Sequence, residues 1–438
     1  MLNKWLFTRI DNSALIVFRI CFGALLAIEA FGAIFTGWVK RAFIDPEFTF
    51  NFIGFDFLQP IPGNGMLWYY AILGLLGIFV MLGWKYRFSM FMFGLMWAGV
   101  YLMQKSSYNN HYYLLMLLCF LMVLLPANRY FSIDAWKNPS IKKISMPRWV
   151  WLLLVLQLWL VYTFAAIAKL YPDWLDGTLP RILMAAKKDY WLVGDFLQQE
   201  WVIYAITYFG LCFDLLIIPL LLWKKTRIFA FLASIFFHLF NSFIFHIGIF
   251  PYLSLAFILF FFPAKSIHQY FLSKKPFLDK QEIRVPSYRK PLIIFLFVWF
   301  LVQFSLPLRH WFIKDDVLWT EEGHRLSWRM MLRSKSGKIK FYVVDKAEKD
   351  TIEVDQTKYL TARQRRAVAA KPDIMWQFAQ RLEKEYAEKG KDVSVYVDSK
   401  LSVNGRPYAQ FIDPNVDLAA EKWKQFRHHD WILASPIE

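Results

Sequence analysis

Long apolar runs fill most of residues 1–309 and decide what this chain can fold into. A membrane-spanning helix needs about 20 mostly apolar residues. The first run contains Arg19 and is too long for the apolar core of a signal peptide, so we predict that it is retained. The stretch from Arg227 to Pro263 is too long for one helix and is read as two spans with a tight turn. The sequence thus predicts nine spans, at residues 14–36, 66–84, 88–104, 111–126, 149–169, 200–223, 228–244, 247–262 and 291–309.

Composition supports a membrane protein. Hydrophobic residues make up 57% of the 438 residues and charged residues only 19%, whereas soluble domains average about 25% charged. The three cysteines, Cys21, Cys119 and Cys212, all lie in apolar runs without zinc-like spacing. We therefore expect no disulfide scaffold and no metal site.

The cations of the loops give the predicted orientation. With the N-terminus in the cytoplasm, the inner loops carry 19 Lys and Arg and the outer loops carry 6, and cytoplasmic loops are enriched in cations. We predict a multi-pass protein of the cytoplasmic membrane whose C-terminal domain is extracytoplasmic. Because the basic excess lies in the apolar part, we expect no nucleic-acid partner.

The last part of the chain has the composition of a soluble domain. Residues 338–345 and 392–398 alternate as strands do, and residues 373–390 have helical periodicity ending at a glycine. The predicted fold is a membrane α-helical bundle, residues 1–309, followed by a small extracytoplasmic α+β domain, residues 310–438.

Polar side chains gather at the predicted outer ends of four spans, where lipid disfavours them. Each has a structural reading: Lys169 could snorkel to headgroups, Asn109 and Asn110 could cap a helix, and His238 could bond between helices. Their convergence on one leaflet favours a site. Arg19 and Asp214 are predicted toward the inner leaflet, with structural roles. The candidate site residues are Asn109, Asn110, His111, Tyr162, Lys169, His238, Asn241 and His310.

Lys169 carries the predicted chemistry. Burial in an apolar site disfavours an ammonium, which makes a neutral amine available as a general base. The sequence has no nucleophile elbow, zinc-protease motif or phosphate-binding loop in a supporting context. A cluster between lipid and a soluble domain suits a lipid-soluble cosubstrate that meets a peptide.

At these residues the sequence resembles the vitamin K-dependent gamma-glutamyl carboxylases, and its membrane part is similar to bacterial relatives with a horizontally transferred transmembrane domain. The resemblance implies that Lys169 is the catalytic base, that Asn110 and His111 are the active-site pair, and that His238, Asn241 and His310 surround them. We also place Asn109 and Tyr162 beside the cosubstrate. The matching strings, in order, are VFRICFG, SSYNNHYYL, PANRYFSID, VYTFAAIAKLYPDW, FFHLFNSFIFHIGIFPY, VQFSLP, LSWRMM and FIDPNVD.

The resemblance also implies a reaction. Family members couple oxygenation of reduced vitamin K, or a menaquinone-type hydroquinone, by O2 with removal of a glutamate γ-proton and capture of CO2. The partners implied are a glutamate-containing peptide or protein and the lipid bilayer. The chain departs from animal relatives at EEGHRL before SWRMM, and it has no cysteine for their disulfide between the membrane and lumenal parts.

Three functions stay open at this stage. The first is a quinol-dependent gamma-carboxylase, and the second is a quinol-epoxidising membrane enzyme without glutamate carboxylation. The third is a non-enzymatic transporter or immunity protein, against which the retention of Lys169, Asn110 and His111 speaks. The protein substrate, the native quinone and the oligomeric state are not determined by the sequence.

Overall fold

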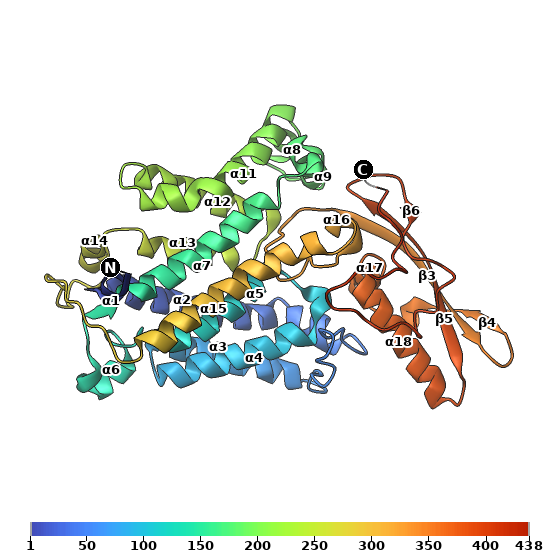
Figure 1. The fold of residues 1–438 in the computed structure, drawn as a ribbon, viewed down its shortest axis with the longest axis horizontal. Helices are drawn as coiled ribbons and strands as arrows, with labels where there is room; N and C mark the ends of the chain where they lie inside the picture. Colours follow the sequence, from blue (N-terminus) through green and yellow to red (C-terminus); the bar gives the residue numbers. More distant parts are fainter. Residues whose placement is uncertain (1, 437–438) are drawn as a thin grey trace.

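The computed structural model describes residues 2–436 and contains a bundle of long helices beside a C-terminal α+β domain (Figure 1). The long helices are α2 (Ser13–Phe35), α3 (Gly65–Leu82), α4 (Tyr86–Met103), α5 (Asn110–Leu124), α7 (Arg148–Ile167), α11 (Glu200–Leu222), α12 (Arg227–Phe245) and α15 (Arg289–Leu308).

Shorter elements connect these helices. A two-stranded sheet pairs β1 (Arg9–Asp11) with β2 (Ser145–Pro147) at the end of the bundle that holds the N-terminus. The short α-helices are α1 (Leu2–Phe7), α6 (Ile133–Lys137), α8 (Pro172–Leu175), α9 (Thr178–Ala185), α10 (Gly194–Leu197), α13 (Phe250–Phe257), α14 (Ala264–Phe271) and α16 (Val317–Thr320). A π-helical turn covers Lys40–Ile44, and 3-10 turns cover Lys105–Ser107, Pro139–Ile141, Ile258–Phe260 and Arg309–Phe312.

Six helices are long and apolar enough to cross a membrane, or seven if one bent pair counts as a span. The predicted count of nine is not confirmed. Helix α4 is long enough but less apolar, since it holds an Arg, two Tyr and a Trp, and α5 has only 15 residues. The predicted span at 247–262 is a short helix that continues to Phe260 and meets α14 at 114°. Pro263 stands at this bend, and proline cannot donate the hydrogen bond that would continue a helix.

Helices α2 and α3 pack closely because glycines face the neighbouring backbone. A Cβ atom on Gly23 would lie 2.2 Å from the backbone nitrogen of Met81, and one on Gly77 would lie 2.6 Å from that of Ala27. Small residues allow such close approach between membrane helices, where packing supplies much of the association energy.

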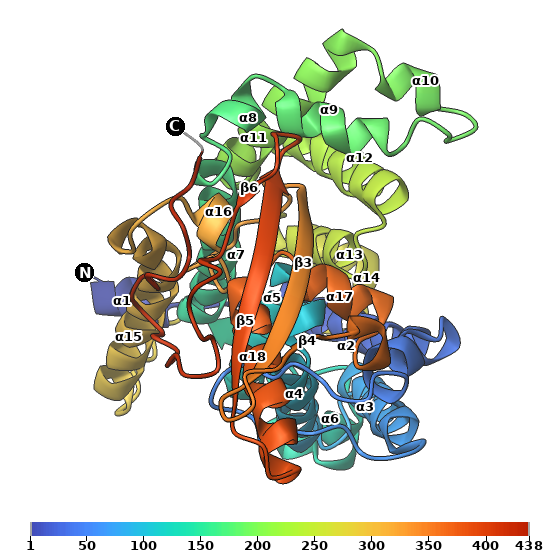
Figure 2. The ribbon, with the colours of Figure 1, turned by 90° about the vertical axis from the view of Figure 1, so that its right-hand side faces the viewer.

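The C-terminal domain is built on a four-stranded antiparallel sheet in the order β4-β3-β5-β6. Its strands are β3 (Lys335–Asp345), β4 (Thr351–Glu353), β5 (Val393–Val403) and β6 (Ala409–Gln410). Helices α17 (Ala362–Val368) and α18 (Pro372–Glu388) lie between this sheet and the bundle, and a 3-10 turn covers Gln356–Lys358 (Figures 1 and 2). The two predicted strands and the predicted helix are confirmed, within a few residues.

A core of its own holds this domain together. Ile374, Phe378 and Leu382 follow the helical spacing that faces one side of α18, and they pack in one cluster with Phe341 and Val395 of the sheet. All five side chains are fully buried.

Buried charges attach the domain to the bundle. Lys105, which follows α4, lies 2.6 Å from Asp373 at the start of α18, and Arg325 lies 2.7 Å from the same carboxylate. Burial alone would raise the pKa of Asp373, but Arg325 and Lys105 outweigh burial and hold it well below its usual range. Removing the Asp373 carboxylate would therefore leave two buried cations without their counterion.

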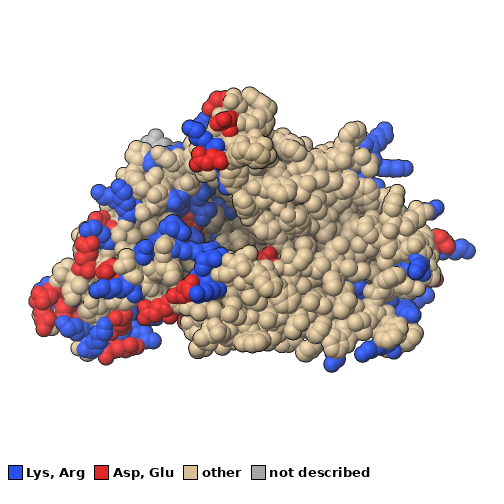
Figure 3. All heavy atoms as spheres, turned by 180° about the vertical axis from the view of Figure 1, so that it is seen from behind, with Lys and Arg blue, Asp and Glu red and all other residues tan. Residues whose placement is uncertain are grey.

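On the face seen from behind, most surface charge gathers toward the two ends of the molecule (Figure 3). Seen from behind, a broad uncharged zone separates the charged C-terminal domain from a group of Lys and Arg side chains at the opposite end (Figure 3). This distribution fits a bilayer around the middle zone and cations on the cytoplasmic side.

The orientation predicts the labelling of introduced cysteines. In intact cells, a cysteine replacing exposed Lys391 in the C-terminal domain should react with a membrane-impermeant thiol reagent. A cysteine replacing exposed Lys142, in the loop that we place inside, should react only after permeabilisation. The unmodified chain, whose three cysteines are unpaired, measures the background. Labelling of position 142 but not 391 in intact cells would reverse the orientation.

Candidate active site

Lys169 lies two residues beyond the end of α7 and forms a buried ion pair with Asp214 of α11. Both side chains are less than a tenth exposed. The Lys169 ammonium also lies 5.2 Å from the centre of the Trp174 ring, a cation–π distance. Because two helices supply the pair, its geometry depends on how α7 packs against α11.

The sequence prediction places Asp214 away from the cluster, and this position is wrong. We expected it near the inner leaflet with a structural role, but its carboxylate contacts the nitrogen of Lys169. Position along α11 gives only an approximate depth, and the Lys169 side chain points back along α7, where its Nζ also lies 3.4 Å from the carbonyl oxygen of Ala165. An ionisable residue inside an apolar run was the available signal, since such residues mark functional sites by default.

A cavity of about 280 Å³ opens beside the pair. Its wall is almost wholly apolar, apart from a few polar groups that include Lys169 and Asp214. Trp201 and Phe236 stand at its rim and are more than 60% exposed on the lipid-facing surface of α11 and α12. A lipid-soluble molecule could therefore enter from the bilayer. No group of three or more potential metal ligands occurs among residues 2–436.

Four of the predicted site residues meet at this cavity with Lys169. His111, at the start of α5, lines it and stacks on Phe250 with ring centres 4.5 Å apart. Tyr162 and Asn241 also line it. His238 lies behind the wall, where its Nε2 shares a 2.9 Å hydrogen bond with the Tyr162 hydroxyl. Within the described residues, the ring nitrogens of His111 make no hydrogen bond, so they are available to a ligand.

The two asparagines contact protein rather than the cavity. Asn109 is the N-cap of α5 and accepts a 2.7 Å hydrogen bond from the backbone of Tyr112, as its structural reading predicts. Asn110 is buried and donates to the backbone carbonyl of Arg329 at 2.9 Å. It also accepts a hydrogen bond from the Tyr108 hydroxyl. Asn110 thus holds the LSWRMM segment, residues 326–331, against α5.

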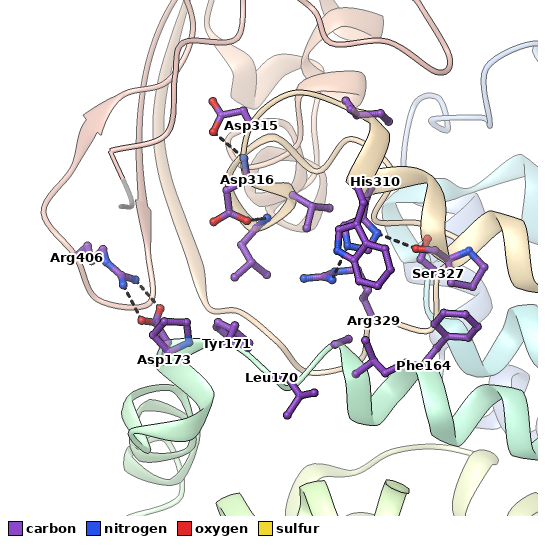
Figure 4. Close-up of a pocket in the computed structure, with 18 residues that line it drawn as sticks. Phe164, Leu170, Tyr171, Asp173, His310, Asp315, Asp316, Ser327, Arg329 and Arg406 are labelled. Atoms are coloured by element: carbon purple, nitrogen blue, oxygen red, sulfur yellow. Dashed lines mark hydrogen bonds and ion pairs between the residues drawn. The ribbon is translucent and has the colours of Figure 1, made fainter.

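His310 lines a second cavity, of about 540 Å³, on the other side of that segment. Its Nδ1 faces the carbonyl of Pro307 at 2.8 Å, and its Nε2 lies 3.2 Å from the Arg329 guanidinium (Figure 4). Arg329 points into this cavity, is only 8% exposed, and its Nε has no hydrogen-bond partner among the described residues. The structure therefore separates His310 from the cavity of Lys169.

The segment between the cavities is locally strained. Leu326, Trp328 and Met331 have φ angles of 59°, 57° and 53°, in the left-handed region that bulky residues rarely adopt. Packing holds them there: Trp328 is buried and stacks on Tyr113 at 4.9 Å. Strain of this kind concentrates at functional sites.

The same segment supplies site residues that sequence reasoning missed. Met330 and Met331 line the cavity of Lys169, and Arg329 lines the second cavity. The available signal was the string LSWRMM, whose match to the family implied no role for any one residue.

Two family models match the chain. The family model described as HTTM domain matches residues 7–265, which is more than half of the chain. The model described as vitamin K-dependent gamma-carboxylase, lumenal domain, matches residues 288–438. The chain belongs to the vitamin K-dependent gamma-carboxylase family. No solved structure matches it. As a gamma-carboxylase-like membrane protein it carries a lumenal domain, which fits a non-cytoplasmic position for the C-terminal part.

If the ion pair forms, replacing Lys169 alone should destabilise the protein more than replacing Lys169 and Asp214 together. Lys169→Ala leaves the Asp214 carboxylate buried without a partner, which should cost about 3–5 kcal/mol of folding free energy. The double variant Lys169→Ala, Asp214→Asn removes both charges and should recover most of that loss. Thermal unfolding in detergent measures both. If the single and double variants unfold at the same temperature, the pair does not form.

Proposed function

We propose that this protein is a quinol-dependent gamma-carboxylase that acts on glutamate in a peptide or protein at the outer face of the cytoplasmic membrane. The observation that carries the proposal is the buried Lys169–Asp214 pair at the wall of an apolar cavity with a lipid-facing rim. Family membership supplies the class of reaction, and the cavity supplies a place for its lipid-soluble reactant.

The apolar cavity fits the ring of a reduced naphthoquinone. Its volume lies near the lower end of the range for small-molecule sites, so the ring would fill it and an isoprenoid tail would extend past Trp201 and Phe236 into lipid. Lys169, Tyr162 and Asn241 are among the polar groups that a quinol hydroxyl could meet there. Reduced vitamin K and menaquinone-type hydroquinones both satisfy these limits.

Lys169 and Asp214 would share one proton, which can move from the amine to the carboxylate. An ammonium is no base, so Lys169 can accept a proton only when its own has moved to Asp214 or left the site. The short contact between the two groups provides that acceptor. Asp214 is then a positioning residue that holds the amine at the cavity wall. The Tyr162–His238 hydrogen bond fixes the Tyr162 hydroxyl on the same wall.

The second cavity suits the glutamate side chain. Arg329 offers a buried guanidinium with an unpartnered Nε, and His310 lies beside it. A guanidinium is well shaped to bind a carboxylate. Asn110 keeps Arg329 and Met330 in place from the α5 side. When bound, the hydroquinone with O2 supplies a base strong enough to remove the γ-proton, and the γ-carbon then forms a bond to CO2.

The test is a reaction in nanodiscs. Purified protein receives reduced vitamin K, O2, isotopically labelled bicarbonate as a source of CO2, and a glutamyl peptide. We expect quinone epoxide together with peptide that has gained the mass of CO2. Epoxide without carboxylated peptide would support the quinol-epoxidising alternative. The absence of both products would overturn the proposal.

The position of His111 leads us to expect that its removal uncouples glutamate carboxylation from quinol epoxidation. Its free ring nitrogens could stabilise charge that develops on the glutamate after the strong base has formed, so His111→Ala should lower carboxylation by about 10²–10³ and epoxidation less. His246 is a matched control because it is exposed at the left-handed turn after α12, a conformation that Asn tolerates. His246→Asn should keep both rates. Equal loss of both rates in His111→Ala would place His111 with the quinol instead.

A further inference from the structure

A basic hollow lies on the C-terminal domain where it meets the bundle. It is a cavity of about 520 Å³, lined by Ser106, Glu321, Arg333, Lys335, Arg363, Arg366, Ala367, Ala370 and Lys371. Five of the nine residues are cations and one is a carboxylate. From behind, Lys and Arg side chains gather around a hollow at the boundary between the charged domain and the uncharged zone (Figure 3).

Most of this positive charge has no counterion among residues 2–436. Glu321 pairs with Arg333 and, at 3.1 Å, with Lys335. Arg363, Arg366 and Lys371 form no ion pair within residues 2–436. The single carboxylate is thus already shared, and the hollow keeps an excess of positive charge.

Burial, and second to it the neighbouring cations, disfavour the charged form of the two lysines that line the hollow. Burial, with Arg325 and Arg333 nearby, lowers the pKa of Lys371 to about 8, even though Glu321 and Asp373 act in the opposite direction. Burial and Arg333 likewise lower the pKa of Lys335 to about 8 against the pull of Glu321. An anion bound in the hollow would relieve the repulsion between these cations, and a concave basic surface concentrates anions.

The hollow adjoins the candidate active site through the LSWRMM segment. Met331 lines the cavity of Lys169, and Arg333, two residues later, lines the hollow. The Tyr171 hydroxyl donates to the carbonyl of Leu332 between them, which ties this stretch to the chain just after Lys169. Helix α17 is anchored beside the membrane part by a 2.7 Å hydrogen bond from Gln364 to the carbonyl of Phe48.

We propose that the basic hollow docks an acidic peptide segment, namely the residues that flank the glutamate to be carboxylated. This inference rests on the proposed function and adds a substrate preference to it. Several separate cations suit several carboxylates along one chain better than a single headgroup. The lining has no aromatic or large aliphatic side chain, which acyl chains would need for burial and nucleic-acid bases for stacking.

The test compares two peptides with the same reacting glutamate. One carries Asp and Glu on both sides of it, and the other carries Asn and Gln there. Wild-type protein should show a lower KM for the acidic peptide, with the advantage shrinking at high salt. The double variant Arg363→Gln, Arg366→Gln changes two exposed side chains and should raise the KM for the acidic peptide about tenfold. It should leave quinol epoxidation unchanged.

A matched variant controls for lost charge alone. Lys338→Gln, Lys340→Gln removes two exposed cations from β3 of the same domain, outside the hollow, and should leave the KM for both peptides unchanged. An equal rise in both double variants, or equal KM values for the two peptides in wild-type protein, would overturn the docking site while the carboxylase function stands.

A binding measurement keeps the inference testable if no peptide is carboxylated. A fluorescent acidic peptide is titrated onto the protein in nanodiscs of neutral lipid, and its anisotropy is read. Wild-type protein should bind it at least several-fold more tightly than the Arg363→Gln, Arg366→Gln variant. Equal binding overturns the proposal. So does a result in which that variant loses affinity only for vesicles of anionic lipid, since this would make the hollow a lipid site.

Discussion

A lysine and an aspartate face each other near the outer end of an apolar helix bundle, where neither charge could stay alone. Helix α7 delivers Lys169 and α11 delivers Asp214, so the pair forms only when these helices are packed. Breaking such a pair costs more than replacing both partners by neutral groups. The contact therefore constrains the bundle at the place where the cavity opens, and it couples stability to the chemistry of the site.

The LSWRMM segment lies between the cavities that surround the Lys169–Asp214 pair. It leaves the C-terminal domain and returns to the bundle surface. There Arg329 and Met331 line two cavities, one of mixed polarity and one apolar, and Arg333, two residues after the segment, lines the basic hollow. Asn110 and Tyr171 hold its backbone from the membrane side. In the proposed function, this short strained stretch separates the lipid-soluble reactant from the glutamate.

All but one of the ionisable residues in the string EEGHRL, residues 321–326, form ion pairs within residues 2–436. Glu321 binds Arg333, Glu322 binds His428 and His429, and Arg325 binds Asp373. These contacts join the segment to the C-terminal tail and to α18. The string that departs from animal relatives therefore fastens the lumenal domain in place, and it also leaves the neighbouring basic hollow with one shared carboxylate.

Much of the architecture followed from the sequence, because apolar length and loop charge act locally. The apolar runs, the strands around residues 338–345 and 392–398, and the position of Lys169 at the end of an apolar helix could be predicted from the sequence. His111 and Asn241 were likewise expected near it. The nine-span count was not confirmed, because α4 and α5 fall short as spans and α13 meets α14 at a sharp bend.

Only the tertiary structure decided which polar groups meet. Asp214 reached Lys169 because depth in the bundle depends on helix packing, and 45 residues separate the two along the chain. His310 joined Arg329 in a separate cavity, and Asn110 bonded a backbone carbonyl 219 residues away. Residue types and apolar periodicity are properties of the sequence itself. Hydrogen bonds and ion pairs act over a few ångströms, between segments that only folding brings together.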